Sequence, residues 1–555
     1  MQRANLKESG LKLKEEMLMQ LKKEHTCDVL VLGSGIAGIS AALRAAEMGK
    51  QVTLCCKGKL FSGSSFYPGT WGLGLVGPEN EADRRDLAQT IQAVGCGMAD
   101  PAMVEAFVSG ITPAIDRVRK MGVRLRRANQ GQQKEFIPCF DHKHRDWNGI
   151  EFDSAREVFS EALQRRKVRV LAGYEALELV KNGSGVCGAV LYGDGVLHYV
   201  GSGSVVLATG GYGSLFRYHL CTEDVAGMGQ QLALAAGCRL VNMEFMQMMP
   251  GYISPAHKTI FNEKTFRFTH MLRPDGQELL SPAETALLPL RSTHGPFTCR
   301  LASGEIDVAL FRQFLSDPRG ISVHYLSEMI ENPPEFVRVY FDWLLESKHV
   351  SMEDTIHIGI FAHAANGGVR IFPDASTEVP GLFAAGEVTG GMHGADRIGG
   401  LSTANGLVFG TKAGESAAAF AGAGSPEAVE FQTLAAPGCK EALEKMQQCM
   451  FENAMILRSA DGLNHAIGRI SELRNRIRQA AVPSADWTAV AQTRRFLSRC
   501  DTAESILRAA LLRGESRGSH YRTDRPHTDA HMNRKIFVSA DADGIHANFE
   551  KEVLT

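Results

Sequence analysis

The chain has 555 residues, of which 44% are hydrophobic and 22% charged, so it is long enough for two to four packed domains and too apolar to be disordered. Its 60 Lys and Arg against 62 Asp and Glu leave a formal charge of −2, which argues against nucleic acid as a partner. The 57 glycines gather in short clusters beside apolar runs, a pattern typical of tight turns around a bound cofactor.

The N-terminus and the cysteines bear on the compartment. Residues 1–24 mix lysines with glutamates and place apolar residues at helical spacing, which predicts an N-terminal helical extension and no signal peptide. The 12 cysteines include no CxxC pair, so we expect no disulfide framework, zinc site or iron–sulfur ligand set in this chain. No run approaches the ~18 apolar residues of a membrane span. We therefore expect a cytoplasmic protein without a transmembrane segment.

The first strong pattern begins at residue 27. Residues 27–32 predict a buried strand, a glycine-rich turn follows, and residues 39–48 predict a helix that leads to a second strand. In such a unit Gly33 makes the turn, Gly35 lets a pyrophosphate approach, and Gly38 lets helix and strand pack closely. The flanking strand and helix make this signal far more specific than GxGxxG alone, and they predict a phosphate site at the helix N-terminus.

The end of the second strand narrows the choice of cofactor. It reads Cys55-Cys56-Lys57-Gly58 and carries no acidic residue for a ribose 2′-hydroxyl. This departure disfavours a standard NAD site and leaves a flavin dinucleotide open.

Two later strands also end in glycine. Residues 204–211 and 379–388 each read as an apolar strand that breaks into glycine, and residues 402–421 predict a helix after the second. Junctions this far apart predict a cofactor domain that is interrupted by an insertion. We place the insertion at residues 241–351 and interpret it as a lid.

Several motifs together resemble one flavoprotein family. They are the N-terminal glycine motif, Ala208-Thr209-Gly210-Gly211, Thr222-Glu223-Asp224, Gly386-Glu387-Val388, His393-Gly394-Ala395-Asp396-Arg397-Ile398-Gly399-Gly400 and Glu515-Ser516-Arg517-Gly518-Ser519-His520-Tyr521. Their order and spacing are similar to those of the fumarate reductase, succinate dehydrogenase and L-aspartate oxidase flavoproteins. The resemblance covers residues 25 to about 530.

The resemblance implies an α/β fold, with a Rossmann-type FAD-binding domain, an inserted α+β capping (lid) domain and a C-terminal helical domain. The expected divisions are residues 1–24 for the N-terminal extension, 25–240 and 352–430 for the FAD-binding domain, 241–351 for the capping domain, 431–525 for the helical domain and 526–555 for a tail.

The resemblance also implies FAD as the cofactor. The residues expected to bind it are Gly33, Gly35, Gly38, Lys57, Ser64, Ser65, Ala176, Ala208, Thr209, Gly210, Asp224, Glu387 and Ser402. Among these, Glu387 would hold ribityl or ribose hydroxyls, and Ser402 at a helix start would approach the flavin ring. Ser65 stands where membrane-bound relatives carry the histidine that is joined to FAD, so we expect non-covalent FAD.

Two residues are expected to bind a substrate carboxylate. Arg397 matches the family arginine and offers a bidentate fork; the alternative is a structural ion pair with Asp396 or at the surface. His363, in His-Ala-Ala-Asn-Gly-Gly, matches a family histidine that donates to a carboxylate. Its alternative is a satisfied core histidine.

The departures from the family concern the rest of the pocket. Met249 replaces a family histidine, which makes this part of the pocket apolar, unless the residue only fills the core. No residue falls cleanly on the family's proton-delivering arginine: Arg267 lies nearest, with Lys264 and His270 as alternatives. Two lost polar contacts argue against fumarate or succinate as the substrate.

The C-terminal region carries long helical patterns up to residue 513. A charged cluster follows, which we interpret as a solvated face or a docking site: Arg513, Glu515, Arg517, His520, Arg522 and Arg525. No CxxCH haem motif or second flavin domain is visible, so electrons must pass to or from another molecule.

The function expected from these features is FAD-dependent hydride transfer between flavin N5 and a carbon next to the carboxylate of a small organic acid. The enzyme would be a C=C reductase or the reverse dehydrogenase. Two alternatives remain open. One is an amino-acid oxidase of the L-aspartate oxidase type, and the other is a flavoprotein subunit that works with an iron–sulfur or ferredoxin-like electron partner.

Overall fold

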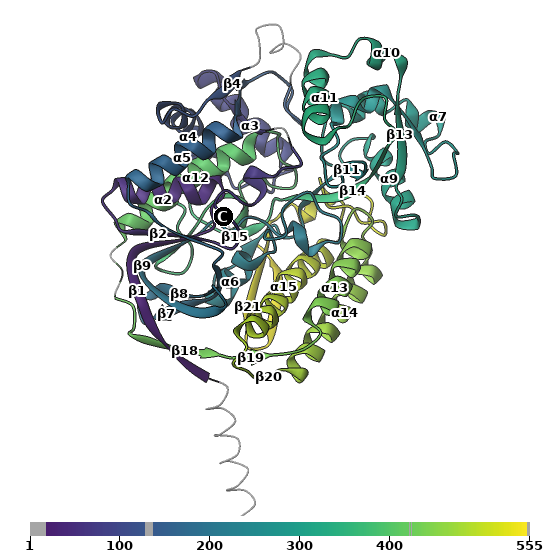
Figure 1. Ribbon diagram of the computed structural model, residues 1–555. Helices are drawn as coiled ribbons and strands as arrows, with labels where there is room; N and C mark the ends of the chain where they lie inside the picture. Colours follow the sequence, from purple (N-terminus) through teal and green to yellow (C-terminus); the bar gives the residue numbers. More distant parts are fainter. Residues whose placement is uncertain (1–17, 71, 128–136, 421, 423, 552–555) are drawn as a thin grey trace, which may run out of the picture.

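The computed structural model describes residues 18–70, 72–127, 137–420, 422 and 424–551. Figure 1 shows a large sheet with helices above it, a capping region to the upper right, and a group of long helices to the lower right. This is the expected mixed α/β architecture, with a Rossmann-type domain, an inserted capping region and a C-terminal helical domain.

The large sheet has eight strands. Its main path runs β6 (Arg169–Ala172), β2 (Val52–Cys56), β1 (Leu18–Leu32), β9 (Val196–Leu207), β8 (Gly185–Gly193) and β7 (Glu175–Asn182). In addition, β16 (Leu382–Ala384) pairs in parallel with β9, and β18 (Ala428–Gln432) pairs with β1 in antiparallel fashion. The carboxyl ends of the parallel strands β1, β9 and β16 therefore meet at one edge, where ligands bind in open α/β sheets.

The predicted glycine turn lies between β1 and α2 (Ile36–Glu47). Gly33 has a φ of +115°, and a Cβ there would lie 2.1 Å from the Ala208 carbonyl oxygen. A Cβ on Gly38 would lie 1.8 Å from the carbonyl oxygen of Gly33. Only glycine fits either position, so the first turn of α2 sits directly against the strand ends.

Helices cover the face of the sheet around this turn. They are α2, α3 (Glu81–Val94), α4 (Pro101–Lys120), α5 (Phe152–Arg165) and α12 (Leu401–Ala419), which lie together above the sheet in Figure 1. Close packing of α12 on α2 depends on small residues, because a Cβ on Gly410 would lie 2.5 Å from the Ala37 carbonyl oxygen. This packing brings the N-terminus of α12 to the same edge as the glycine turn.

The capping region is built on a four-stranded sheet in the order β11 (Met246–Ser254), β14 (Ile356–Ala365), β13 (Ile321–Tyr325) and β12 (Thr269–Leu272). Its helices are α7 (Pro282–Thr285), α8 (Leu288–Arg291), α9 (Gly304–Ser316), α10 (Ser327–Glu331) and α11 (Glu335–Lys348). The sheet includes β14, which follows the expected end of the insertion at residue 351. The sequence could not place this strand, because β14 completes the capping sheet only by pairing with β11, more than a hundred residues earlier.

The C-terminal region contains α13 (Cys439–Ala454), α14 (Ala460–Ala480) and α15 (Trp487–Leu512). Residues 526–555 are more than a tail, because they include the hairpin β21 (Ile536–Asp541) and β22 (Gly544–Phe549). Strand β21 pairs with β10 (Leu240–Val241), and the hairpin extends a five-stranded sheet with β15 (Gly368–Arg370) and β17 (Thr389–Gly390). Pairing with strands hundreds of residues away makes this segment part of the core.

The expected N-terminal helix is wrong for residues 18–24, which belong to β1. Leu18 pairs with Gln432, and the register continues to Lys22 opposite Ala428. Pairing with β18 outweighs the local helical spacing of the apolar residues. Residues 1–17 lie outside the described residues.

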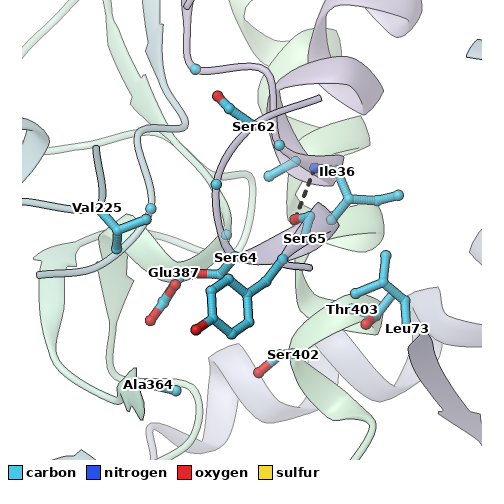
Figure 2. A pocket seen from close by; sticks show the side chains of 18 of the residues that line it. Ile36, Ser62, Ser64, Ser65, Leu73, Val225, Ala364, Glu387, Ser402 and Thr403 are labelled. Atoms are coloured by element: carbon cyan, nitrogen blue, oxygen red, sulfur yellow. Dashed lines mark hydrogen bonds between the residues drawn. The ribbon is translucent and has the colours of Figure 1, made fainter. Parts of the chain in front are cut away.

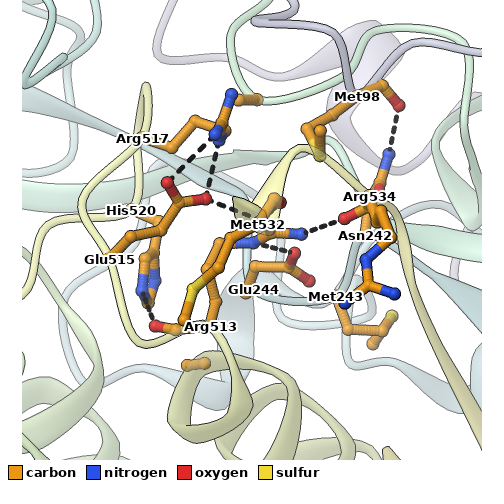
Figure 3. A network of polar contacts seen from close by, with 12 residues as sticks. Met98, Asn242, Met243, Glu244, Arg513, Glu515, Arg517, His520, Met532 and Arg534 are labelled. Carbon is orange, nitrogen blue, oxygen red and sulfur yellow. Dashed lines mark hydrogen bonds and ion pairs between the residues drawn. The ribbon is translucent and has the colours of Figure 1, made fainter. Parts of the chain in front are cut away.

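The charged cluster after α15 is buried, which corrects its interpretation as a solvated or docking face. Glu515 accepts hydrogen bonds from Arg513 (Nη1 to Oε1, 2.9 Å) and Arg517 (Nε to Oε1, 2.7 Å), as Figure 3 shows. Arg513 also donates through Nε to Glu244 Oε1 at 2.7 Å, and both side chains are fully buried. Of the cluster, only Arg525 is exposed. Alternating charges make the cluster a cross-link between the helical domain and the segment that precedes β11.

Across the described ranges, no helix combines the length and the apolarity that a bilayer crossing requires.

Candidate active site

A cavity of about 420 Å³ opens at the edge where the parallel strands end. Twelve of the thirteen expected cofactor residues line it: Gly33, Gly35, Lys57, Ser64, Ser65, Ala176, Ala208, Thr209, Gly210, Asp224, Glu387 and Ser402. Gly38 instead lies beneath the turn, where it permits close packing. Arg397 and His363 line the same cavity, so one space joins the expected cofactor and substrate residues.

The N-terminus of α2 faces this cavity with little side-chain capping. Its N-cap is Gly35, and the Ile36 amide donates to Ser65 Oγ at 3.1 Å (Figure 2). The neighbouring Ser62 Oγ donates to Asp224 Oδ2 at 3.0 Å. Free amides at a helix N-terminus bind anions, so this end of the cavity fits a phosphate group.

Other polar groups also line the cavity. Thr209 Oγ1 is buried without a hydrogen-bond partner. Glu387 Oε1 accepts the Ala365 amide at 2.9 Å, and burial raises the pKa of this carboxyl group. Figure 2 shows Glu387 and Ser402 facing the space from different elements. Groups of this kind suit the hydroxyls and ring edge of a flavin dinucleotide.

Lys57 is held at the cavity wall by Glu175. Its Nζ lies 2.8 Å from Glu175 Oε1, and Glu175 is itself 5% exposed. Burial lowers the pKa of Lys57, with Glu175 acting in the opposite direction.

Arg397 is oriented by a residue that the sequence analysis did not identify. Its Nε donates to Gln247 Oε1 at 2.9 Å, and Gln247 Nε2 donates back to the Arg397 carbonyl oxygen at 3.3 Å. The fully buried Gln247 thus occupies Nε and leaves the two terminal nitrogens of the guanidinium for a ligand. The only signal in the sequence was its place two residues before Met249.

Asp396 does not neutralise Arg397. It accepts from Arg300 Nε at 2.8 Å and from Thr298 Oγ1 at 2.7 Å. Burial lowers the pKa of Arg397, and Glu387 and Cys139 oppose this effect. The alternative of an Arg397–Asp396 ion pair is therefore wrong, because Arg300 takes the carboxylate.

His363 reaches the cavity from β14. Its Nδ1 is buried without a hydrogen-bond partner, and burial together with Arg397 lowers the pKa of the imidazole to about 3. The ring is neutral at neutral pH, so it can contribute a hydrogen bond but no charge.

The adjacent residues Met248 and Met249 of β11 face opposite ways, as successive side chains of a strand do. Met249 lines the cavity and packs with Tyr67, Leu220 and Phe361. Met248 is 0% exposed and belongs to the hydrophobic core. Of these two methionines, Met249 is the one that contributes to the apolar wall expected where the family has a histidine.

None of the three expected proton donors is brought to the cavity. Arg267 is exposed, with its guanidinium 4.7 Å from the centre of the Phe268 ring. His270 is also exposed and bonds Glu278 at 2.6 Å. Lys264 reaches the Ile137 carbonyl oxygen at 3.4 Å. The sequence placed the right segment near the site, but it could not give the rotation of the short helix η4 (Glu263–Phe268).

Two other side chains line the cavity near the start of η4. They are Glu263, the first residue of η4, and Cys139, from the loop before β5 (Asp146–Ile150). The sequence analysis named neither as a site residue. Nothing near Cys139 in the sequence signals its position.

The fold and the cavity define a flavin-dinucleotide-binding protein, in which the expected cofactor residues and Arg397 line one space. Two family profiles match the chain: "FAD binding domain" over residues 28–270 and 326–403, and "Fumarate reductase flavoprotein C-term" over residues 443–553. The protein belongs to the fumarate reductase, succinate dehydrogenase and L-aspartate oxidase family of FAD-dependent oxidoreductases.

Individual relatives span nearly the whole chain. One of the subunits of the CoM/CoB fumarate reductase of Methanothermobacter marburgensis is 28% identical and covers 93% of this chain and 97% of its own. L-aspartate oxidase of Vibrio cholerae is 26% identical, with coverages of 94% and 99%. The structure of quinol fumarate reductase from E. coli superposes with a TM-score of 0.76 at 22% identity, covering 96% of this chain and 97% of that one.

Proposed function

We propose that the protein reduces the C=C bond of an unsaturated organic acid, or catalyses the reverse oxidation, and that fumarate and succinate are not its preferred substrates. The observation that carries this proposal is the cavity itself, in which Arg397 lies beside the expected flavin-binding residues and Met249 forms part of the wall.

The chain's own residues would divide the work as follows. FAD supplies the hydride donor or acceptor. Arg397, held by Gln247 at 2.9 Å, binds the carboxylate as a bidentate fork and orients the acid. His363 adds an uncharged hydrogen bond, and Met249 excludes water from the apolar end of the substrate.

The apolar wall at Met249 supports an acid with a single carboxylate as the substrate. A thioether cannot pair with a second carboxylate, and a buried unpaired charge costs several kcal/mol. Met249 lies among Tyr67, Leu220 and Phe361, which favours an apolar or aromatic group at that end of the acid.

The electron partner belongs to the same proposal. One relative is named as one of the subunits of a fumarate reductase, which supports a separate iron–sulfur or ferredoxin-like partner for this chain. L-aspartate oxidase relatives support the second candidate, in which oxygen reoxidises the flavin after an amino acid has reduced it. Met249 disfavours this candidate, because aspartate is a dicarboxylate. The cytoplasmic location stays a prediction.

Anaerobic stopped-flow spectroscopy tests the proposal. The holoenzyme is reduced with dithionite and mixed with a panel of unsaturated monocarboxylic and dicarboxylic acids, or with oxygen. We expect a monocarboxylic acid with an apolar or aromatic substituent to reoxidise the flavin fastest. Reoxidation by oxygen alone, together with flavin reduction by L-aspartate, would favour the oxidase instead, and fastest reoxidation by fumarate would contradict the substrate class.

A further inference from the structure

Two cavity side chains are joined beside Arg397. Cys139 Sγ donates a hydrogen bond to Glu263 Oε1 at 2.9 Å. The same loop is fixed to the arginine segment, since the Gly399 amide donates to the Cys139 carbonyl oxygen at 3.1 Å. The Cys139–Glu263 hydrogen bond therefore connects a loop of the FAD-binding domain with the capping region. The Cys139–Gly399 hydrogen bond fixes that loop two residues from Arg397 in the sequence.

The pair shares one small region with Met249. A Cβ on Gly295 would lie 3.0 Å from Met249 Cε, 3.4 Å from Cys139 Sγ and 3.7 Å from the Glu263 carboxyl carbon. All four residues line the cavity. A carboxyl group therefore stands at the edge of the apolar wall that would contact the substrate.

The thiol fixes the position of the carboxyl group. Burial and the neighbouring Glu263 raise the pKa of Cys139 to about 12, so the thiol stays protonated and acts as the donor. Within the part of the chain that the structure describes, no ion pair holds Glu263. Its second oxygen is thus not committed to a cation.

Other proton-exchanging groups near Arg397 are less suited to the reaction. His363, with a pKa of about 3, is a weak base and carries no excess proton at neutral pH. Glu387 is engaged by the Ala365 amide at 2.9 Å. Arg267 and His270 are exposed on the outside of the capping region.

We propose that Glu263 is the catalytic acid and base of this site and that Cys139 is its positioning residue. The inference rests on the proposed function. In the reductive direction, one alkene carbon receives the hydride with its electron pair. The O–H bond of Glu263 breaks, its proton forms the new C–H bond at the other alkene carbon, and solvent reprotonates the Glu263 carboxylate. In the oxidative direction, Glu263 removes that proton.

The substitution Glu263→Gln keeps the shape of the side chain and removes the exchangeable proton. We expect kcat to fall by ~10²- to 10⁴-fold, the usual range for general acid–base catalysis, while KM stays within threefold and FAD content is unchanged. Glu278→Gln is the matched control, since Glu278 is an exposed glutamate of the same region, with 63% of its side chain accessible. Glu263→Asp should recover part of kcat, and it provides the test if the Gln variant does not fold.

A binding measurement does not depend on turnover. The Kd of a saturated monocarboxylate, followed through the flavin spectrum, should stay within threefold of the wild-type value in Glu263→Gln, because Arg397 and not Glu263 holds the carboxylate in the proposed function. A Kd that rises with the fall in kcat would instead make Glu263 a binding residue.

Cys139 is tested by two substitutions. Cys139→Ser keeps a hydrogen-bond donor and should retain kcat within threefold, whereas Cys139→Ala should lower kcat while KM stays within threefold. Equal kcat values in the two variants would overturn the positioning role.

The outcomes separate the two proposals. If wild-type enzyme turns over an acid and Glu263→Gln retains kcat within threefold, or raises KM alone, Glu263 is not the proton donor and the proposed function stands. If no acid reoxidises the wild-type flavin, the proposed function fails, and the acid–base role of Glu263 falls with it.

Discussion

Replacing Arg397 by lysine tests how the carboxylate is held. In the wild type, Gln247 occupies Nε at 2.9 Å, so the two terminal nitrogens form a fork whose direction is fixed. Lysine keeps the positive charge, but it loses the fork and leaves the buried Gln247 oxygen without its donor. Truncating one partner of a buried, hydrogen-bonded charge pair costs ~2–5 kcal/mol. At ~1.4 kcal/mol per tenfold, kcat/KM should fall by ~30- to 5000-fold.

Anaerobic kinetics with the best acid of the panel measure this change, and the flavin absorbance released on denaturation measures FAD content. Arg319→Ala is the matched control, because Arg319 is 70% exposed and pairs only with the surface residue Asp317. We expect FAD content to be unchanged in both variants, since the substitution of Arg397 should weaken substrate binding and not cofactor binding. A lysine variant within threefold of wild type would refute the reasoning and make Arg397 a structural residue.

Three further predictions concern the cofactor, the apolar wall and the neutral histidine. Acid denaturation followed by filtration should release all flavin, because Ser65 cannot form a histidyl link; fluorescence on the denatured chain in a gel would disprove this. Met249→His should raise kcat/KM for dicarboxylates relative to monocarboxylates by at least threefold, because an imidazole can donate to the second carboxylate; an unchanged ratio would show that Met249 only fills space. His363 has a folded-state pKa of about 3 against 6.5 when unfolded, so the unfolded chain binds the additional proton and stability is lost as pH falls below 6.5. Between pH 7 and pH 5 this one residue should lower the free energy of unfolding by about 2 kcal/mol. In urea unfolding at both pH values, the free energy of unfolding of His363→Gln should fall by about 2 kcal/mol less than that of the wild type.

The sequence predicted most reliably what depends on neighbouring residues. A Cβ at Gly33 or Gly38 would lie less than 2.5 Å from a backbone oxygen, so only glycine fits the turn. A requirement for glycine can be recognised directly in the sequence. The apolar strands on either side are equally local. The residues that line this end of the cavity could therefore be predicted almost one by one, while their binding of FAD stays a prediction.

Features that depend on distant partners could not be predicted in this way. Arg513 and Glu515 look like a solvated run, yet they are buried because Glu244, some 270 residues earlier, supplies the opposing charge. Gln247 and Arg397 meet across 150 residues, and a sequence carries no sign of such a pairing. The hairpin after residue 526 likewise depends on its pairing with β10.

The choice between Glu263 and Arg267 as proton donor also depends on packing that the sequence does not show. Arg267 and Glu263 lie four positions apart on the same short helix. The sequence located this segment at the site, but only the packed structure shows that the rotation of η4 directs Glu263 inward and Arg267 outward.

The charged residues of the cavity limit the number of carboxylates on the substrate, which membership of the family alone does not. Arg397 binds one carboxylate in the proposed function, while Glu263 and Met249 lie together at the Gly295 wall. A second carboxylate there would meet a carboxyl group that must itself give up and regain a proton, and like charges at close range disfavour both ionised forms. An acid with one carboxylate and an apolar group avoids this conflict, because its apolar end packs on Met249 and leaves Glu263 free to transfer the proton.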